Sequence, residues 1–311
     1  MNDNMLWCEK YRPRTIADCI LPESIKVPFQ EYVSKKEIPN LILTGSSGVG
    51  KTTIARALCE EVGSDYILIN GSDESGIDTL RVKVKGFASS VSLSGGRKVI
   101  IIDEADYLTP AAQAAFRGVI EEFSSNCSFI FTVNFINRLI QPLHSRCAVI
   151  NFKLPNEQKS KMAVLFMKRL EMILANEKVK YEKPIIAELI TKFFPDYRRV
   201  LNEIQRYAVS GVVDSGILNQ VNNVKLTELI GYIKAKDFKS IRKWVGLNSD
   251  MDSSKVFREI YDGLFEILKP NSVPLVVVLL AKYQYQAAFV VDQEINLCAF
   301  LTEIMVEAEF K

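Results

Sequence analysis

One glycine-rich segment constrains the fold of this chain more than any other feature of its sequence. Residues 45–52 read GSSGVGKT and match the pattern G-x-x-x-x-G-K-[ST] in full. The apolar run LILT precedes the segment, and a helix-forming stretch, TTIARALCEEV, continues from it. Glycines here let backbone N–H groups turn toward phosphate oxygens, and a helix N-terminus adds positive potential. The segment predicts a phosphate-binding loop between a strand and a helix. The alternative, a glycine-rich turn without a ligand, is disfavoured because the string and its context agree.

The loop residues that would hold a nucleotide follow from this match. Lys51 would reach the β- and γ-phosphates, and Thr52 would ligate Mg²⁺. The predicted cofactors are therefore ATP and Mg²⁺. The expected nucleotide-binding residues of the loop and of the first helical turn are Gly48, Val49, Gly50, Lys51, Thr52 and Thr53.

An acidic motif closes a second apolar run. Residues 99–106 read VIIIDEAD, so Asp103 and Glu104 stand where a buried strand would end. Asp103 would hold Mg²⁺ through water or Thr52, and Glu104 would polarise the water that attacks the γ-phosphate. Asn134, at the end of the next run, would orient that water. The motif predicts nucleotide hydrolysis; the alternatives are a polar strand end for the two acids and a turn for Asn134.

Short apolar runs predict the strands of one parallel sheet. They are rich in Ile, Val and Phe, and they occupy 41–45, 66–70, 98–103, 128–133 and 148–152. Such runs suit strands buried on both faces, and the helical patterns between them supply covering layers. After residue 152 only helical periodicity continues. We predict an α/β domain over 1–154 and two helical domains, over 155–222 and 223–311.

Composition excludes several classes of protein. The 311 residues carry 39 Lys and Arg against 37 Asp and Glu, which excludes a globally basic, histone-like chain but not a local basic patch. Six cysteines without a C-x-x-C pair and one histidine disfavour a zinc site. The longest apolar run, 275–281, is far shorter than the ~20 residues that span a bilayer. We expect a cytoplasmic protein with no membrane segment and no signal peptide.

The motifs together resemble one family, the AAA+ sliding-clamp loaders of the replication factor C group. Their order along the chain is that of the family: EKYRP at 9–13, the phosphate loop, DEAD at 103–106, TVN at 132–134 and SRC at 145–147. Further matching segments are NGSD at 70–73, AQAAFR at 112–117 and PDYRR at 195–199. Residues 211–218, GVVDSGIL, look most similar to the large, ATP-hydrolysing subunit of T-even-phage clamp loaders.

The resemblance implies a fold, an activity and partners. It implies an AAA+ domain with a parallel five-stranded sheet, a small helical lid domain and a helical collar domain that joins subunits. It implies an ATPase, stimulated by DNA and by the clamp, that loads a ring-shaped sliding clamp onto primer–template DNA. In phage loaders, four copies of such a chain join one small subunit in a pentamer. A phage-encoded chain would act in the cytoplasm of the host bacterium.

The resemblance also implies roles for single residues. Arg146 of the SRC motif would be an arginine finger that reaches the nucleotide bound by the neighbouring subunit. Arg198 would contact the nucleotide of its own chain from the lid. The alternatives are solvated charges for both arginines. The adenine would lie against the N-terminal segment and an apolar wall, formed by Cys8, Glu9, Lys10, Tyr11 and Ile20; the alternative is a segment that simply packs on the sheet.

Basic residues of two predicted helices are candidates for DNA contact. Arg81 and Lys85 are four residues apart and share one helix face, which could follow phosphates by charge rather than by sequence. The full set of candidates is Arg81, Lys83, Lys85, Gln113 and Arg117. The alternative is a solvated run of charge. A second alternative for Gln113 is a link between DNA contact and Glu104 across the subunit interface.

Two rival functions are open from the sequence. The string DEAD suggests a helicase, but that class needs a second motor domain, and no second five-strand pattern follows residue 155. A scaffold subunit would bind ATP without hydrolysing it, and the presence of Lys51, Glu104 and Arg146 argues against it. ATP turnover by the assembled complex separates the scaffold from the ATPase.

Overall fold

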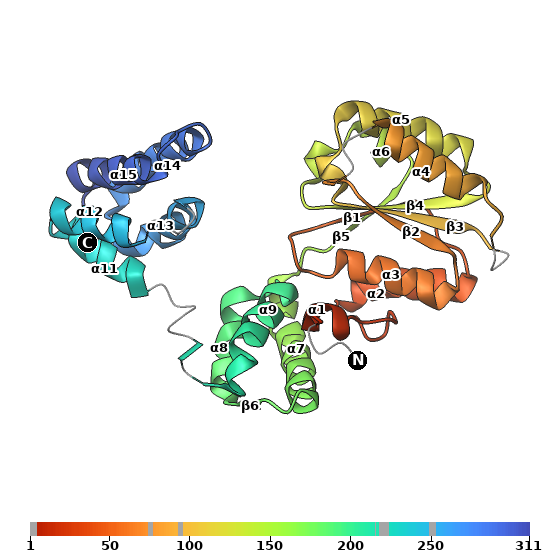
Figure 1. Cartoon of the computed structure of the whole chain (residues 1–311), viewed down its shortest axis with the longest axis horizontal. Coiled ribbons are helices and arrows are strands. Elements are labelled where there is room, and N and C mark those ends of the chain that lie inside the picture. Colours follow the sequence, from red (N-terminus) through yellow and green to blue (C-terminus); the bar gives the residue numbers. More distant parts are fainter. Residues whose placement is uncertain (1–4, 74–76, 93–95, 215, 218–223, 249–252) are drawn as a thin grey trace. The chain divides into compact units, whose positions relative to one another are not determined.

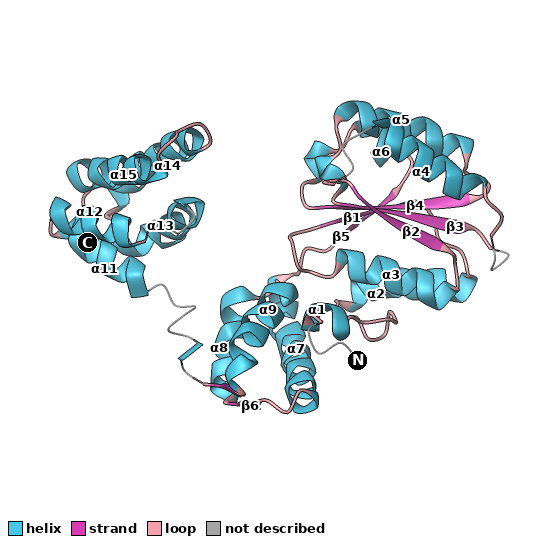
Figure 2. Ribbon diagram, viewed as in Figure 1, coloured by secondary structure: helices cyan, strands magenta, loops and turns pink. Residues whose placement is uncertain are grey.

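The computed structural model describes residues 5–73, 77–92, 96–214, 216–217, 224–248 and 253–311. The chain divides into two compact units, Met1–Ile217 and Leu218–Lys311 (Figure 1). The first unit holds a sheet with helices on both faces, followed by a group of helices. The second unit is helical (Figure 2).

The five apolar runs of the sequence form one parallel sheet, as predicted. Its strands are β1 (Leu41–Thr44), β2 (Tyr66–Asn70), β3 (Lys98–Asp103), β4 (Cys127–Val133) and β5 (Ala148–Asn151). Their order across the sheet is β2-β3-β4-β1-β5. In register, Leu41 pairs with Ile130 of β4 on one side and with Ala148 of β5 on the other. The crossovers between these parallel strands run through helices that cover the sheet.

Side chains alternate between the two faces of the sheet, and each face packs against a different set of helices. Leu41 and Leu43 pack in one buried cluster with residues of α2 (Glu23–Lys35) and α3 (Lys51–Val62). Ile42 packs in the other cluster, with α4 (Ile77–Ser89), α5 (Pro110–Glu122) and α6 (Gln141–His144). The two helical layers on either side of the strands are visible in Figure 1. The apolar residues thus fix which helix lies on which face.

The strand order brings three polar strand ends together at one edge. β1 leads into the glycine-rich loop, and β3 leads into Glu104 and η1 (Ala105–Tyr107). β4, which lies between them, leads into Asn134 and η2 (Ile136–Arg138). The carboxyl ends of parallel strands share one edge, so this edge is where a ligand site is expected.

The helices after the sheet form the rest of the first unit. They are α7 (Asn156–Asn176), α8 (Lys183–Phe193), α9 (Tyr197–Tyr207) and η3 (Ala208–Ser210), with the short strands β6 (Lys180–Tyr181) and β7 (Val212–Val213). α1 (Trp7–Lys10) packs on α9, and Trp7 N donates to Gln205 Oε1 at 2.8 Å. The N-terminal segment is therefore tied to this helical group, 198 residues later in the sequence.

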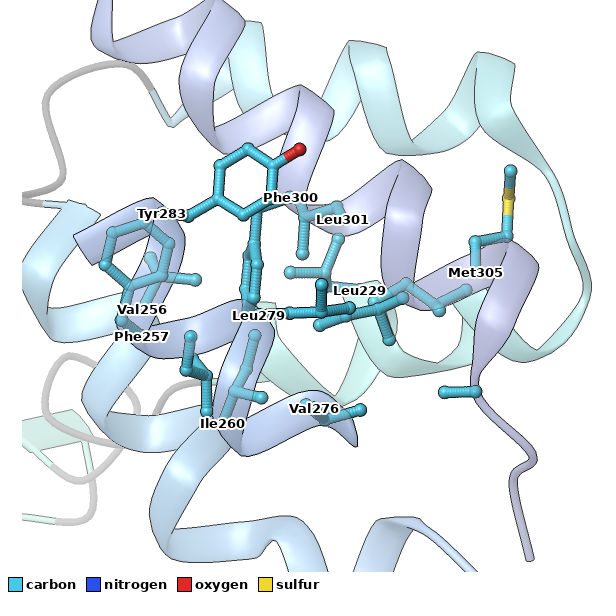
Figure 3. Packing of buried hydrophobic residues seen from close by; sticks show 14 of the residues in the cluster. Leu229, Val256, Phe257, Ile260, Val276, Leu279, Tyr283, Phe300, Leu301 and Met305 are labelled. Atoms are coloured by element: carbon cyan, nitrogen blue, oxygen red, sulfur yellow. The ribbon is translucent and has the colours of Figure 1, made fainter. Parts of the chain in front are cut away.

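The second unit has its own apolar core. Its elements are α11 (Val224–Lys234), α12 (Phe238–Leu247), α13 (Ser253–Ile267), η4 (Pro270–Ser272), α14 (Val273–Ala287) and α15 (Gln293–Glu307). Phe300 lies at the centre of the packing in Figure 3, with the ring of Phe257 5.0 Å away edge-on. None of the helices in the described part of the chain combines the length and apolar character that a membrane span requires.

Candidate active site

A cleft at the carboxyl edge of the sheet is lined by both parts of the first unit. The glycine-rich loop and the ends of β3 and β4 form one wall, and α7 and α9 form the other. The N-terminal segment closes it with Cys8, Tyr11 and Ile20. The cleft therefore gathers residues that the sequence separates by almost 200 positions.

Lys51 is folded into the loop that precedes it. Its Nζ donates to Gly45 O at 2.7 Å, to Ser46 O at 2.7 Å and to Asn134 Oδ1 at 2.9 Å. The residue is only 8 % exposed, and burial lowers the pKa of Lys51 to about 8, although Asp103 and Asp106 oppose this shift. The contact with Asn134 joins the loop to the end of β4.

A hydroxyl and a carboxylate meet at the centre of the cleft. Thr52 Oγ1 donates to Asp103 Oδ1 at 2.6 Å, and the Thr132 hydroxyl donates to the same oxygen. Glu104 follows with φ 55°, a left-handed backbone conformation that is uncommon for a residue with a side chain. Its N–H donates to Thr132 Oγ1 at 3.1 Å. Oxygen ligands of this kind suit Mg²⁺.

The second wall of the cleft rests directly on the loop. Tyr197 N donates to Gly48 O at 3.2 Å, and Tyr197 Oη donates to Ile20 O at 3.0 Å. Arg198 lines the cleft, and its charge contributes to the lowered pKa of Lys51. Arg199 instead stacks on Phe193, with its guanidinium 4.2 Å from the ring centre. Of these two neighbouring arginines, Arg198 is the one that faces the cleft.

The N-terminal candidates divide into two groups. Cys8, Tyr11 and Ile20 line the cleft. Glu9 instead pairs with Arg12, whose Nε lies 3.1 Å from Glu9 Oε2, and Lys10 Nζ lies 2.6 Å from an oxygen of Glu177. The side chains of Glu9 and Lys10 are thus engaged elsewhere.

Arg146 lies apart from the cleft of its own chain. Its Nε donates to Glu121 Oε1 on α5 at 3.0 Å, and its Nη1 donates to Pro142 O at 2.8 Å. The ion pair holds the pKa of the exposed Glu121 carboxyl below its usual range. Arg146 therefore has a partner within its own subunit.

The DNA candidates on α4 and α5 have different surroundings. Lys83 and Arg117 are exposed, and Lys85 Nζ forms an ion pair with Glu122 of α5 at 2.9 Å. Arg81 belongs to α4, but its side chain falls outside the part of the structure that is described.

Gln113 is enclosed rather than presented to solvent. The residue is 2 % exposed; its Nε2 donates to Leu108 O at 3.0 Å and to Arg138 O at 3.1 Å. Its Oε1 accepts from Ile140 N at 2.9 Å. The Gln113 amide is thus buried and bonded to three backbone groups of its own chain, rather than exposed as direct contact with DNA would require.

Thr132 in the cleft and Asp106 next to it in the chain's hydrogen-bond network were given no role in the sequence analysis. Thr132 shares Asp103 with Thr52, and Asp106 accepts hydrogen bonds from the backbone beyond β4. Both stand within motifs that the sequence displayed, TVN and DEAD. Their partners lie 28 or 29 residues away in the chain, so the motifs alone gave no sign of the contacts.

Comparisons with known proteins agree with this architecture. Residues 41–155 match the family described as ATPase family associated with various cellular activities (AAA). Residues 158–219 match the family described as sliding-clamp-loader large subunit, AAA+ ATPase lid domain.

Similar sequences cover most of the chain. It is 35 % identical over 309 residues to the sliding-clamp-loader large subunit of Enterobacteria phage T4, which covers 97 % of this chain and 96 % of the relative. The same subunit of Escherichia phage RB69 is 42 % identical over 240 residues, 75 % of each chain. The replication factor C small subunit of Archaeoglobus fulgidus is 35 % identical, covering 84 % of this chain and 85 % of the relative. A solved structure of a Thermotoga maritima RuvB variant shares the fold, with a TM-score of 0.54, 17 % identity, and coverage of 71 % and 79 %.

Proposed function

Since this chain belongs to the sliding-clamp-loader family of AAA+ ATPases, we propose that it couples ATP hydrolysis to the loading of a ring-shaped clamp onto primer–template DNA. One observation carries the proposal. Lys51, the Thr52–Asp103 pair, Glu104, Asn134 and Arg198 meet at one cleft. A chain that only bound nucleotide would not require a carboxylate beside the γ-phosphate position.

The residues of the cleft fit Mg²⁺-ATP. Backbone N–H groups of residues 48–53 would hold the phosphates, and Lys51 would exchange its carbonyl partners for the β- and γ-phosphates. Thr52 and Asp103 would hold Mg²⁺, which would neutralise charge that develops on the phosphates. Glu104 polarises the attacking water and Asn134 orients it. Cys8, Tyr11 and Ile20 form the wall against which the adenine lies.

Two arginines would make hydrolysis depend on conformation and assembly. Arg198 follows Tyr197, whose N–H bonds to the loop, so a nucleotide bound by Arg198 would fix the angle of the lid. Arg146 would act in trans on the nucleotide of the neighbouring subunit. To do so it must leave Glu121, because a paired guanidinium carries little net charge to the phosphate. Trans-acting arginine fingers raise NTPase rates by roughly 10³–10⁵.

The same family membership supports a proposal for the assembly. We propose an AAA+ domain over 1–154, a lid over 155–222 and a collar over 223–311, with four copies and one small subunit in a pentamer. Arg81, Lys83, Lys85 and Arg117 would line the path of the DNA and contact its phosphates. Gln113 would couple this contact to the nucleotide site rather than touch DNA itself.

The scaffold alternative is tested with a change at Glu104. In the assembled complex, Glu104→Gln is expected to bind ATP with unchanged affinity and to lose turnover by about 10²-fold or more, the usual contribution of a general base. Equal turnover by the variant and the unchanged chain would refute the role of Glu104. Absence of turnover in both would favour the scaffold. The helicase alternative has less support, since the described residues form a single five-stranded sheet.

A further inference from the structure

Asp106 is a buried carboxylate with an uncommon set of partners. It lies in η1 at 5 % exposure, three residues after Asp103. Its Oδ1 accepts from Asn134 N at 3.3 Å, and its Oδ2 accepts from Phe135 N at 3.3 Å. Among the described residues, no lysine or arginine forms a direct ion pair with it. The two backbone N–H groups are therefore its hydrogen-bond donors.

These partners explain why a carboxylate occupies this position. β4 ends at Val133, so the N–H groups of the next two residues have no strand to pair with. A carboxylate offers one acceptor oxygen to each of them and no donor. An asparagine would satisfy one N–H and turn its own NH₂ group toward the other. Burial of a charge is costly unless hydrogen bonds satisfy it, so the two backbone N–H groups are what allow a carboxylate to be buried here.

The contacts join the two segments that carry the hydrolytic residues. Glu104 lies immediately before η1, and Tyr107 N donates to Glu104 O at 3.0 Å across that turn. Asn134 begins the segment held by Asp106, and its side chain accepts from Lys51 at 2.9 Å. Asp106 itself is not among the residues that line the cleft.

We propose that Asp106 is a positioning residue for ATP hydrolysis: its carboxylate holds Asn134 in register with Glu104, so that both side chains act on one attacking water. The inference rests on the proposed function, which assigns Asn134 and Glu104 to that water. Asp106 does not touch the nucleotide. Its loss should therefore alter the chemical step more than the binding of ATP.

The test is Asp106→Asn in the assembled complex, with steady-state turnover measured against ATP concentration. We expect kcat to fall about ten- to a hundredfold, the range for a small misplacement of a catalytic group, while KM changes less than about twofold. The same substitution is then made in an Asn134→Ala background. If Asp106 acts through Asn134, it should cost less than about twofold there.

The outcomes separate this inference from the proposed function. An equal loss of kcat in both backgrounds, or a loss expressed mainly in KM, would overturn the role of Asp106. An Asn134→Ala variant with unchanged kcat would instead overturn the role of Asn134 in the proposed function. If the Asp106→Asn variant fails to assemble, Asp106→Glu replaces it, because glutamate keeps the carboxylate on a longer side chain. The same measurements are then made in both backgrounds and judged by the same criteria.

A matched control comes from the second unit. Asp237, which is exposed, caps α12: its carboxylate accepts from Ser240 N at 3.1 Å and from Ser240 Oγ at 2.6 Å. Asp237→Asn also removes a carboxylate that accepts two hydrogen bonds, far from the cleft in sequence. We expect its kcat to equal that of the unchanged chain. A comparable loss in the control would mean that the assay reports general destabilisation, and Asp106 would lose its special role.

Discussion

The contact between the loop and the lid can be tested at a single glycine. Gly48 has φ 73°, and its O accepts from Tyr197 N. A Cβ placed on Gly48 would overlap the Asp196 carboxylate and lie 3.2 Å from Asp196 Cα. That carboxylate cannot simply rotate away, because its Oδ1 caps α9 by accepting from Arg199 N at 2.9 Å. Gly48→Ala should therefore displace the start of α9 together with the adjoining Arg198.

Its cost can be worked out from two contributions. A residue with a Cβ in the left-handed region costs roughly 1–2 kcal/mol. Loss of the Asp196 cap adds about 1 kcal/mol. We expect Gly48→Ala to lower the free energy of unfolding by about 2–3 kcal/mol. Loss of the proposed contact between Arg198 and the nucleotide, a hydrogen bond to a charged group, should weaken ATP binding by at least about tenfold.

Gly63 supplies the control. It ends α3 with φ 74°, nearly the same as Gly48, but a Cβ there would meet nothing within 4 Å. Gly63→Ala should cost only the roughly 1–2 kcal/mol of the backbone strain and leave ATP affinity unchanged. Urea unfolding followed by the fluorescence of Trp7, in a Trp244→Phe background, reports on the first unit. Equal losses in the two variants, with ATP affinity retained by Gly48→Ala, would refute the reasoning.

Three further experiments test separate parts of the structure. Glu121→Gln removes the ion pair that holds Arg146 within its own subunit. It should raise the ATP turnover of the complex, measured without DNA, by up to about fivefold. A decrease in turnover would mean that Glu121 holds Arg146 in its active position. Cys59 is fully buried, and burial raises the pKa of its thiol to about 12, so iodoacetamide at pH 8 should alkylate it much more slowly in the folded chain than in urea, a rate read by mass spectrometry; equal rates would show that the thiol is accessible in the folded chain. Lys98 is buried, and its Nζ donates to Ser90 Oγ at 3.0 Å and to backbone carbonyls at the end of α4. Lys98→Met should therefore lower the free energy of unfolding by about 1–3 kcal/mol, measured by unfolding in urea. An unchanged midpoint of urea unfolding would show that water replaces the ammonium.

The fold was predictable because its three inner strands, β1, β3 and β4, are buried on both faces; the edge strands β2 and β5 are partly exposed and only their apolar composition marked them. Residues such as Ile100 and Ile101 have no polar neighbour to reveal which face they occupy, yet both are fully buried, one in each layer. A continuous apolar run bounded by polar residues therefore locates each strand. It does not give the order of the strands, which depends on how the crossovers pack.

The residues of the candidate site could be predicted only where a sequence motif is typical of one kind of chemistry. Thr52 and Asp103 could be paired in advance, because a hydroxyl and a carboxylate on Mg²⁺ are what the phosphate loop requires. The Arg146–Glu121 pair joins residues 25 positions apart, and neither one defines the other by pattern. Gln113 lies on a helix, as predicted, but it is buried rather than exposed, because its hydrogen-bond partners Arg138 and Ile140 lie on another segment. Long-range contacts of this kind are set by packing.

We propose that this ATPase turns over rapidly only when primer–template DNA and the clamp are both bound, and one measurement tests this dependence directly. Steady-state ATP turnover would be measured on the chain co-expressed with the proposed small partner subunit. The conditions are no DNA, single-stranded DNA, and primer–template DNA with the cognate clamp. We predict strong stimulation only with primer–template and clamp together, and loss of that stimulation in Arg146→Ala. Stimulation by single strands alone would contradict the account and indicate a translocating motor.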